Sequence, residues 1–589
     1  MTTRSWTDLH AAAGALDRSL GDPADPANPC GFRAMADRTR ADELPVTLAE
    51  RAAALRLSFI PVADGGDLGA MDEALALVRV AARRDPTVMP TTMISITAAA
   101  VLLVSGSDRQ KADLVRLLRN GGSVTFARAD QDGDPAVPAG CRILVQPDGG
   151  VRLDGEMDFV GFVPTTAAVL VLAPTGSAAP GALTAVLLRN EEVGVRHSAG
   201  RFLGGIEFAR LHCDIAAGSD AVVGPPGRAM GALIPALQLV STFSLAGHLA
   251  AADTALRVTA DFAADHRLGR RPVGDEPFCR RRLGTAAAAL IAADAVSLVS
   301  ARTMHTLPET AAVRSLVAKK VVGELTADAI RWCGEVQSTA APVRADGTLD
   351  ALVLHNNTIG YLDTSPLRSV KLLTPQLLSM AADTSRAPVA DPPGADALRT
   401  ACAVDERLPL FRPQALTVLA RGSDPIIRGL PHLVDSTEKA LPGSELAGLV
   451  RAVVAQFGRI FGDLADVASR GRPGQDLLLE LTERFCYLYA AAECVHLWHG
   501  SHHLPLYGAA PGSPGWLTVT LSLLLRRAIG GPVHLPAAEA DQALGVLEPL
   551  RRTGRLFAAV PVALSESCRP AGPGQPDTNV NQRVWSDSR

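Results

Sequence analysis

Two stretches decide the fold of this chain: FIPVADGGDLGAMDEALALVRVAARRDPTV at residues 59–88 and GSDRQKADLVRLLRNGGSVTFARADQDGD at residues 106–134. In the first, a Gly-rich turn precedes a helix predicted over residues 72–84, where apolar residues recur at helical spacing. Pro86 ends that helix, because proline disfavours helical backbone in the residue before it. In the second, Ser107 and Asp108 are N-cap candidates for a helix over residues 109–119, and the chain then enters a strand.

The pattern of predicted elements changes several times along the 589 residues. Residues 1–121 are predicted to be helical, and residues 122–225 carry short strands that form a small β domain, a barrel or a sandwich. The turn residues at 147–150 predict a hairpin between strands at 142–146 and 151–153, and a further strand is predicted at 156–162. Residues 226–384 contain four long helices, at 229–266, 277–306, 311–334 and 367–383, which predict an antiparallel bundle. A Pro-rich linker at 385–396, an extra helical domain at 397–565 and a disordered tail at 566–589 follow. The predicted fold is mainly α with a small central β domain.

Bulk composition excludes several classes of function. The formal net charge of −4 gives no electrostatic case for binding nucleic acid. The apolar run at residues 91–104 is shorter than the ~20 residues of a membrane span, so a buried core helix is expected there. The first residues lack the apolar segment of a secretory signal. Nine scattered cysteines without a CxxC pair indicate reduced thiols and a cytoplasmic location.

Taken in order and spacing, these motifs over residues 45–385 resemble the acyl-CoA dehydrogenase superfamily, and the extra helical domain resembles its longer members and the acyl-CoA oxidases. The resemblance implies FAD bound between the β domain and the bundle. It also implies an acyl-CoA or acyl-carrier-protein thioester as substrate. A carboxylate would remove the α-proton while hydride passes to flavin N5, and an electron-transfer partner or O₂ would then reoxidise the flavin.

The resemblance places two flavin contacts in the β domain. The family's first contact strand carries a Thr-Glu-Pro segment, and here Arg128 falls near that threonine and can donate to a flavin carbonyl. A solvated strand arginine explains Arg128 equally well. The second strand aligns without a gap at residues 155–161. Phe159 takes the place of the family's tryptophan as an aromatic packing residue. Gly161 takes the place of a threonine and lacks its hydroxyl, so only the backbone N–H can donate to the flavin. As plain strand residues, Phe159 would be core and Gly161 a bulge.

Two further cofactor contacts are implied in the bundle. Arg267, followed by Gly269, lies where the family has an arginine that reaches FAD on a neighbouring subunit. An arginine-rich surface loop explains it as well. Gly334 occupies the first position of the family's Gly-Gly pair, but Glu335 occupies the second, and a carboxylate there opposes a phosphate.

The base is implied at Asp363. The family's catalytic glutamate precedes the last bundle helix, and a gapless match puts Leu362 on it, so Asp363 lies one residue away and is one methylene shorter. The alternative interpretation is an N-cap, supplied by Asp363, Thr364 or Ser365 before Pro366. Val240 and Ser241 occupy the other position that the family uses for a base, and neither is a carboxylate.

A histidine-rich stretch is a candidate metal site. Cys494, His496, His499, His502 and His503 end a predicted helix, but histidines also favour helix C-termini, so no metal is expected.

Three functions follow from the resemblance. The first is an FAD-dependent acyl-thioester dehydrogenase or oxidase, acting as a homodimer or as a hetero-oligomer with a homologue. The second is a flavin-poor, non-catalytic partner subunit of such a hetero-oligomer. The third is a flavin monooxygenase-like member, and fold alone does not choose among the three.

Overall fold

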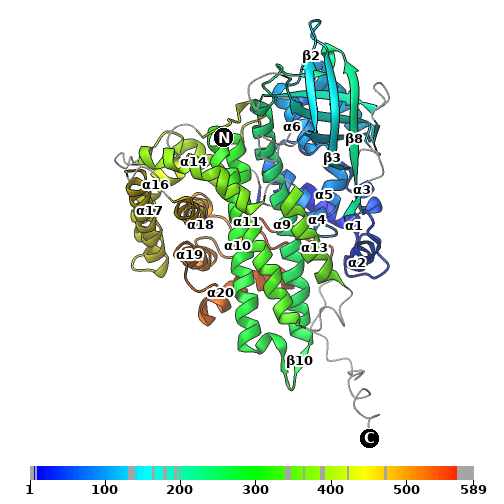
Figure 1. Cartoon of the computed structure of the whole chain (residues 1–589). Helices are drawn as coiled ribbons and strands as arrows, with labels where there is room; N and C mark the ends of the chain where they lie inside the picture. The colour runs from blue at the N-terminus through cyan, green and yellow to red at the C-terminus, as the bar shows by residue number, and fades with distance from the viewer. Residues whose placement is uncertain are drawn as a thin grey trace.

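The chain folds in the predicted order of helices, strands, helices and further helices, as Figure 1 shows. This computed structural model describes residues 5–6, 9–129, 140–161, 166–176, 182–190, 196–197, 201–203, 205–338, 347–362, 365–384, 392–420, 424–469 and 474–566. All structural statements below concern these residues. The fold class predicted from the sequence is confirmed.

The N-terminal part consists of short helices: α1 (Ala11–Leu20), α2 (Phe32–Ala41), α3 (Val46–Arg51), α4 (Met71–Ala82), α5 (Val88–Thr92), α6 (Ile96–Ser105) and α7 (Asp108–Arg119). The predicted start of α7 is confirmed by a capping box. Ser107 Oγ accepts from the Gln110 N–H at 3.3 Å, and Gln110 Oε1 accepts from the Ser107 N–H at 2.9 Å. Most of α6 is buried, as expected for the apolar run at 91–104.

Two sheets form the β domain. One has the order β1 (Val124–Arg128), β4 (Ala168–Pro174), β5 (Leu183–Arg189) and β9 (Val222–Val223). The other has the order β2 (Cys141–Val145), β3 (Val151–Gly161), β8 (Ile206–Ala217) and β6 (Arg196–His197), with β7 (Arg201–Leu203) also paired to β8. The β2–β3 hairpin is confirmed. Apolar side chains of both sheets share one buried cluster.

One strand prediction is wrong. Residues 151–153 and 156–162 were expected to form two strands, but β3 runs continuously to Gly161. The break in the sequence pattern reflects a local distortion of the backbone. Gly155 has a φ of 119°, which a side chain would strain, and the register shifts between Met157 and Val160.

The predicted four long helices are α9 (Met230–Asp265), α10 (Pro277–Thr306), α11 (Ala311–Gln337) and α14 (Pro366–Thr384). A fifth helix that the sequence pattern did not predict, α13 (Thr348–Leu362), packs beside α9 and α11. A short hairpin, β10 (Arg267–Leu268) and β11 (Arg271–Pro272), links α9 to α10 at the end of the bundle away from the β domain (Figure 1). The alanines of the run at 286–293 are fully buried, so neighbouring helices approach α10 closely.

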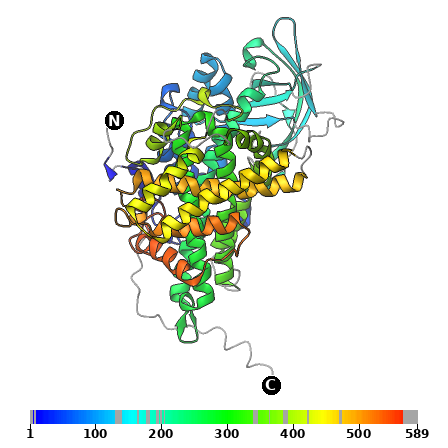
Figure 2. The same ribbon diagram turned by 90° about the vertical axis from the view of Figure 1, so that its left-hand side faces the viewer.

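The C-terminal helices are α15 (Ala395–Cys402), α16 (Pro425–Ala440), α17 (Glu445–Ser469), α18 (Gln475–Ser501), α19 (Gly515–Ala528) and α20 (Ala537–Arg552). Figure 2 shows them lying across the bundle. They share one large buried cluster with α9, α10 and α11, so this part is packed into the main core. The described chain ends at Glu566, which belongs to the folded part because its carboxylate is ion-paired with Arg83 and Arg257.

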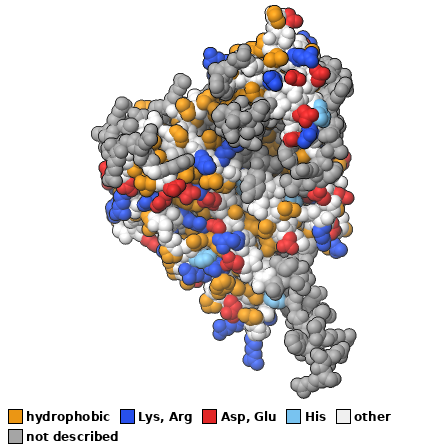
Figure 3. All heavy atoms as spheres, in the orientation of Figure 1, with side chains coloured by type: hydrophobic (Ala, Val, Ile, Leu, Met, Phe, Trp, Pro, Cys, Tyr) orange, Lys and Arg blue, Asp and Glu red, His pale blue; other side chains and the backbone are white. Residues whose placement is uncertain are grey.

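Two described helices, α9 and α10, are long and apolar enough to cross a membrane. Their apolar windows are 72% and 100% buried inside the protein, which is the environment of core helices. On the face shown in Figure 3, acidic and basic side chains are intermingled among the coloured residues.

Candidate active site

The strands that carry the predicted β-domain contacts adjoin where the two sheets meet. Thr125 of β1 is buried, and its hydroxyl donates to the Gly161 carbonyl at the end of β3, at 2.6 Å. Arg128 ends the same strand, β1, and is half-buried. An added Cβ at Gly161 would lie 3.6 Å from the Phe208 ring, an ordinary contact distance. The structure therefore brings the strands of Arg128 and Gly161 together.

Phe159 lies within β3 at the register shift between Met157 and Val160. Its side chain is outside what the structure describes. The predicted aromatic contact therefore stays a prediction.

Arg267, one of the two contacts predicted in the bundle, lies apart from the β-domain pair. Arg267 is exposed in the β10–β11 hairpin, and its Nη1 donates to the Arg270 carbonyl at 3.1 Å. Figure 1 shows this hairpin at the opposite end of the molecule from β2 and β3. Within one chain, Arg267 does not join Arg128 and Gly161.

Gly334 lies in the last turns of α11, and no atom is within 4 Å of the place where a Cβ would be. The neighbouring Glu335 does not offer a bare negative charge. Its carboxylate pairs with Arg282 of α10 and accepts from Arg331 Nη1 at 2.9 Å. From the sequence, Glu335 was expected to repel a phosphate of FAD. That repulsion is weaker in the structure, because two guanidinium groups lie beside the carboxylate.

The proposed base, Asp363, lies outside the described residues. The helices around it are described: α13 ends at Leu362, and α14 begins at Pro366. Ser365 Oγ accepts from the Arg368 N–H at 3.2 Å, which is an N-cap interaction. Ser365 therefore fills the capping role that was the alternative explanation for Asp363.

A buried polar cluster lies beside the end of α13, and sequence reasoning missed it. Lys319 Nζ of α11 is 2.9 Å from Ser244 Oγ and 3.3 Å from His248 Nε2, both on α9. His248 Nδ1 is 2.8 Å from Asn356 Oδ1 of α13. An ammonium only donates, so the network assigns the His248 proton to Nδ1. A Cβ on Gly360 would lie 3.8 Å from the His248 ring, which places the cluster against the last turn of α13. The sequence signal for this cluster is the presence of Lys319 and His248 within long apolar helices.

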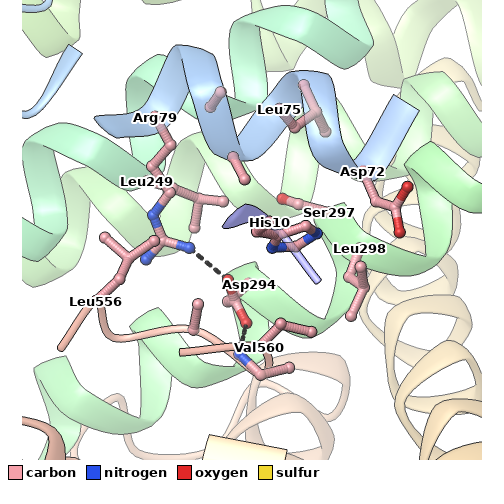
Figure 4. Close-up of a pocket in the computed structure, with 14 residues that line it drawn as sticks. His10, Asp72, Leu75, Arg79, Leu249, Asp294, Ser297, Leu298, Leu556 and Val560 are labelled. Atoms are coloured by element: carbon pink, nitrogen blue, oxygen red, sulfur yellow. Dashed lines mark hydrogen bonds and ion pairs between the residues drawn. The ribbon is translucent and has the colours of Figure 1, made fainter. Parts of the chain in front are cut away.

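A cavity of about 50 Å³ lies between α4, α9, α10 and the C-terminal segment (Figure 4). Its polar lining residues include His10, Asp72, Arg79, Asp294 and Ser297, and Leu75, Leu249 and Val560 contribute apolar walls. None of the residues that the resemblance assigns to flavin lines this cavity, which has room for a few water molecules rather than a dinucleotide.

An ion pair stabilises the buried carboxylate of Asp72 beside this cavity. Burial alone raises the pKa of Asp72, but its charge interactions with Arg302, His10 and His305 and its hydrogen bond from Arg302 together hold that pKa below its ordinary value. Arg302 Nη1 donates to Asp72 Oδ2 at 2.7 Å, and both side chains are 1% exposed. This pair ties the N-terminal helices to the bundle.

Two histidines of the histidine-rich stretch make hydrogen bonds to the neighbouring helix α16. His496 Nε2 contacts the Ile426 carbonyl at 2.9 Å, and His499 Nε2 contacts Thr437 Oγ1 at 2.9 Å. Burial lowers the pKa of each imidazole to about 4. Within the described part of the chain, no group of three or more His, Cys, Asp or Glu side chains is placed to hold a metal ion.

Comparison with solved structures identifies the arrangement. An acyl-CoA dehydrogenase from Bacillus anthracis, complexed with FAD, is 13% identical, and the match covers 93% of this chain and 90% of that chain with a TM-score of 0.63. Butyryl-CoA dehydrogenase from Megasphaera elsdenii is 14% identical over 64% of this chain and 100% of that chain, with a TM-score of 0.56. Nitroalkane oxidase from Podospora anserina is 15% identical over 64% and 96%, with a TM-score of 0.54.

No protein-family model and no curated protein matches the sequence. The Bacillus anthracis match extends over the C-terminal helices as well as the three parts that precede them, whereas the other two cover a smaller share of this chain. The chain has the fold of the acyl-CoA dehydrogenase superfamily, in a form that includes an additional C-terminal helical region.

Proposed function

We propose that this protein is an FAD-dependent dehydrogenase of an acyl thioester, carried on CoA or on an acyl-carrier protein. The observation that carries the proposal is the match over nearly the whole chain to an acyl-CoA dehydrogenase complexed with FAD. Fold alone does not establish chemistry. The residues at the site therefore decide how the proposal is tested.

The described residues are compatible with a flavin at the positions that the resemblance names. Arg128 supplies hydrogen-bond donors at the sheet junction, and the Gly161 backbone N–H stands in for a hydroxyl. The open space at Gly334 admits a bulky group, and the exposed Arg267 is available to a neighbouring subunit. Bound FAD would supply the acceptor for the substrate's β-hydride.

Asp363 is the proposed base for the α-proton. A base must reach the proton it removes within hydrogen-bond distance, and the short link between α13 and α14 carries this carboxylate. Ser365 caps α14, so the capping function does not require Asp363. We also propose a cytoplasmic homodimer, or a hetero-oligomer with a homologue, that returns electrons to a protein partner or to O₂.

A second candidate is a flavin-poor, non-catalytic subunit of a hetero-oligomer. Glu335 favours it, because this carboxylate stands where the family has glycine and occupies Arg282 and Arg331 in ion pairs. In that case the arginines serve the fold and are not available to a pyrophosphate.

The visible spectrum of the purified protein separates the two. A dehydrogenase should be yellow, with absorbance near ~450 nm, and should bleach when an acyl-CoA is added without oxygen. Exchange of the substrate α-proton with D₂O should be lost in Asp363→Asn and retained in Ser365→Ala, the matched control. A colourless protein that ignores added FAD, alone and mixed with a copurifying homologue, would refute the dehydrogenase.

A further inference from the structure

The last described stretch, residues 554–566, folds back after α20 as a hairpin. Gly554 has a φ of 57°, which reverses the chain. The Leu556 N–H then donates to the Val562 carbonyl at 2.9 Å. Its apolar side packs with the N-terminal helices in a small cluster of Ala13, Ala76, Val80, Leu556, Ala558 and Val562. The end of the chain therefore contacts its beginning.

Charged side chains from both sides hold the tip of this hairpin by its backbone. The Phe557 N–H donates to Asp253 Oδ2 of α9 at 2.9 Å, and Arg79 Nη2 of α4 donates to the Phe557 carbonyl at 2.7 Å. The Ala559 N–H donates to Asp294 Oδ2 of α10 at 2.7 Å. Backbone groups of the hairpin thus complete hydrogen bonds of buried charges on the N-terminal helices and on the bundle.

The far end of the hairpin is held in the same way. The Ser565 N–H donates to Asp17 Oδ2 of α1 at 2.6 Å. The Glu566 carboxylate pairs with Arg83, the C-cap residue of α4, and its Oε2 lies 3.2 Å from Arg257 Nε of α9. Glu566 therefore contacts one arginine from each side of the interface.

Charge balance makes Glu566 important to this interface. The ion pairs here join four arginines to three aspartates: Arg79, Arg83, Arg84, Arg257, Asp17, Asp253 and Asp294. The side chains of Arg83, Arg84, Asp17 and Asp253 are fully buried. Glu566 supplies the fourth negative charge, and a buried charge without its partner is strongly unfavourable.

We propose that residues 554–566 act as a clasp that locks the N-terminal helices onto the bundle, and that Glu566 closes it. Opening the interface then requires the clasp to release, because the arginines and aspartates that pair across the interface also bind the hairpin. Since the clasp follows α20 in the chain, the N-terminal helices can dock firmly only after residues 554–566 have been made.

Native-state hydrogen exchange of the full chain, followed by mass spectrometry at increasing sub-denaturing urea, tests the clasp. In the wild type, the hairpin should become exchangeable together with α1 and α4, with the same dependence on urea. In Glu566→Gln, exchange of these three segments should accelerate about tenfold or more, because one partner of a buried ion pair has lost its charge. Glu438→Gln, which removes the charge of a half-exposed glutamate paired with Arg451, should leave them unchanged.

Two outcomes would overturn the proposal. One is a wild-type hairpin that exchanges freely while α1 and α4 remain protected. The other is a folded Glu566→Gln protein in which only residues next to 566 exchange faster. The wild-type measurement decides the matter by itself if Glu566→Gln does not fold.

Discussion

The contact between α10 and α20 makes a sharp prediction about Gly284. An added Cβ at this position would lie 2.3 Å from the Ala540 carbonyl oxygen and 2.6 Å from the Ala540 Cα, all of them backbone atoms of α20. Backbone cannot rotate away, so α20 must shift by roughly 1 Å to restore van der Waals distances. We expect Gly284→Ala to destabilise the protein through overpacking, which costs about 1–3 kcal/mol.

A second glycine separates overpacking from helix propensity. Gly458 lies inside α17, is exposed, and has no atom within 4 Å of an added Cβ. Both substitutions gain about 1 kcal/mol from replacing glycine by alanine in a helix, so this gain cancels in the comparison. The free energies of unfolding of the two variants should therefore differ by about 1–3 kcal/mol, with Gly284→Ala the less stable.

Urea unfolding followed by tryptophan fluorescence measures this difference, because Trp332 and Trp516 are buried in the core cluster that contains α10 and α20. The midpoint of Gly284→Ala should lie below that of Gly458→Ala, with similar slopes. Equal midpoints would refute the close approach of α20 to α10.

Three further predictions concern buried charges and the cofactor. The pKa of His496 and His499 is about 4 in the folded protein and about 6.5 in the unfolded chain. Between these values the unfolded state binds more protons, so stability should be full above pH ~6.5 and decline toward pH 4. Urea midpoints across this range should fall less steeply in a His496→Gln, His499→Gln variant. Asp72→Asn should cost about 3 kcal/mol at pH 7 by leaving Arg302 without its carboxylate. Because the folded pKa of Asp72 is lowered, wild type should lose this advantage as pH falls through that folded pKa, and an undiminished difference at low pH would contradict the ion pair. Gly334→Ala should keep or raise the urea midpoint but weaken FAD binding in a fluorescence titration; unchanged affinity would remove Gly334 from the cofactor site.

Features set by local chemistry were predictable from the sequence. Ser107 and Gln110 have the spacing of a capping box, and the structure contains that box. The Gly-rich turn at residues 147–150 lies between strands that pair as expected. The four long bundle helices follow from their apolar, Ala-rich composition, and their predicted ends agree closely with the observed ones.

Features that depend on contacts between distant residues were not predictable. Arg79 and Arg83 fit the polar positions of an amphipathic helix, yet both are buried, because Asp253 comes from a helix far along the chain. The Lys319 cluster requires α9, α11 and α13 to meet, and no periodicity encodes that meeting. The helix α16 contains Pro431, and because proline disfavours the interior of a helix, the sequence does not predict a helix there.

The burial of α10 has a consequence during synthesis on the ribosome. Its most apolar window is entirely covered in the finished molecule, and much of the cover comes from α11, α18, α19 and α20. Those helices follow α10 in the chain, and α20 is the last of the four to be made. During synthesis there is therefore an interval in which an apolar helix long enough to cross a membrane is exposed, because the helices that later cover it have not yet been made. Pairing with α9, which is made just before it, is the first cover that the chain itself offers to α10.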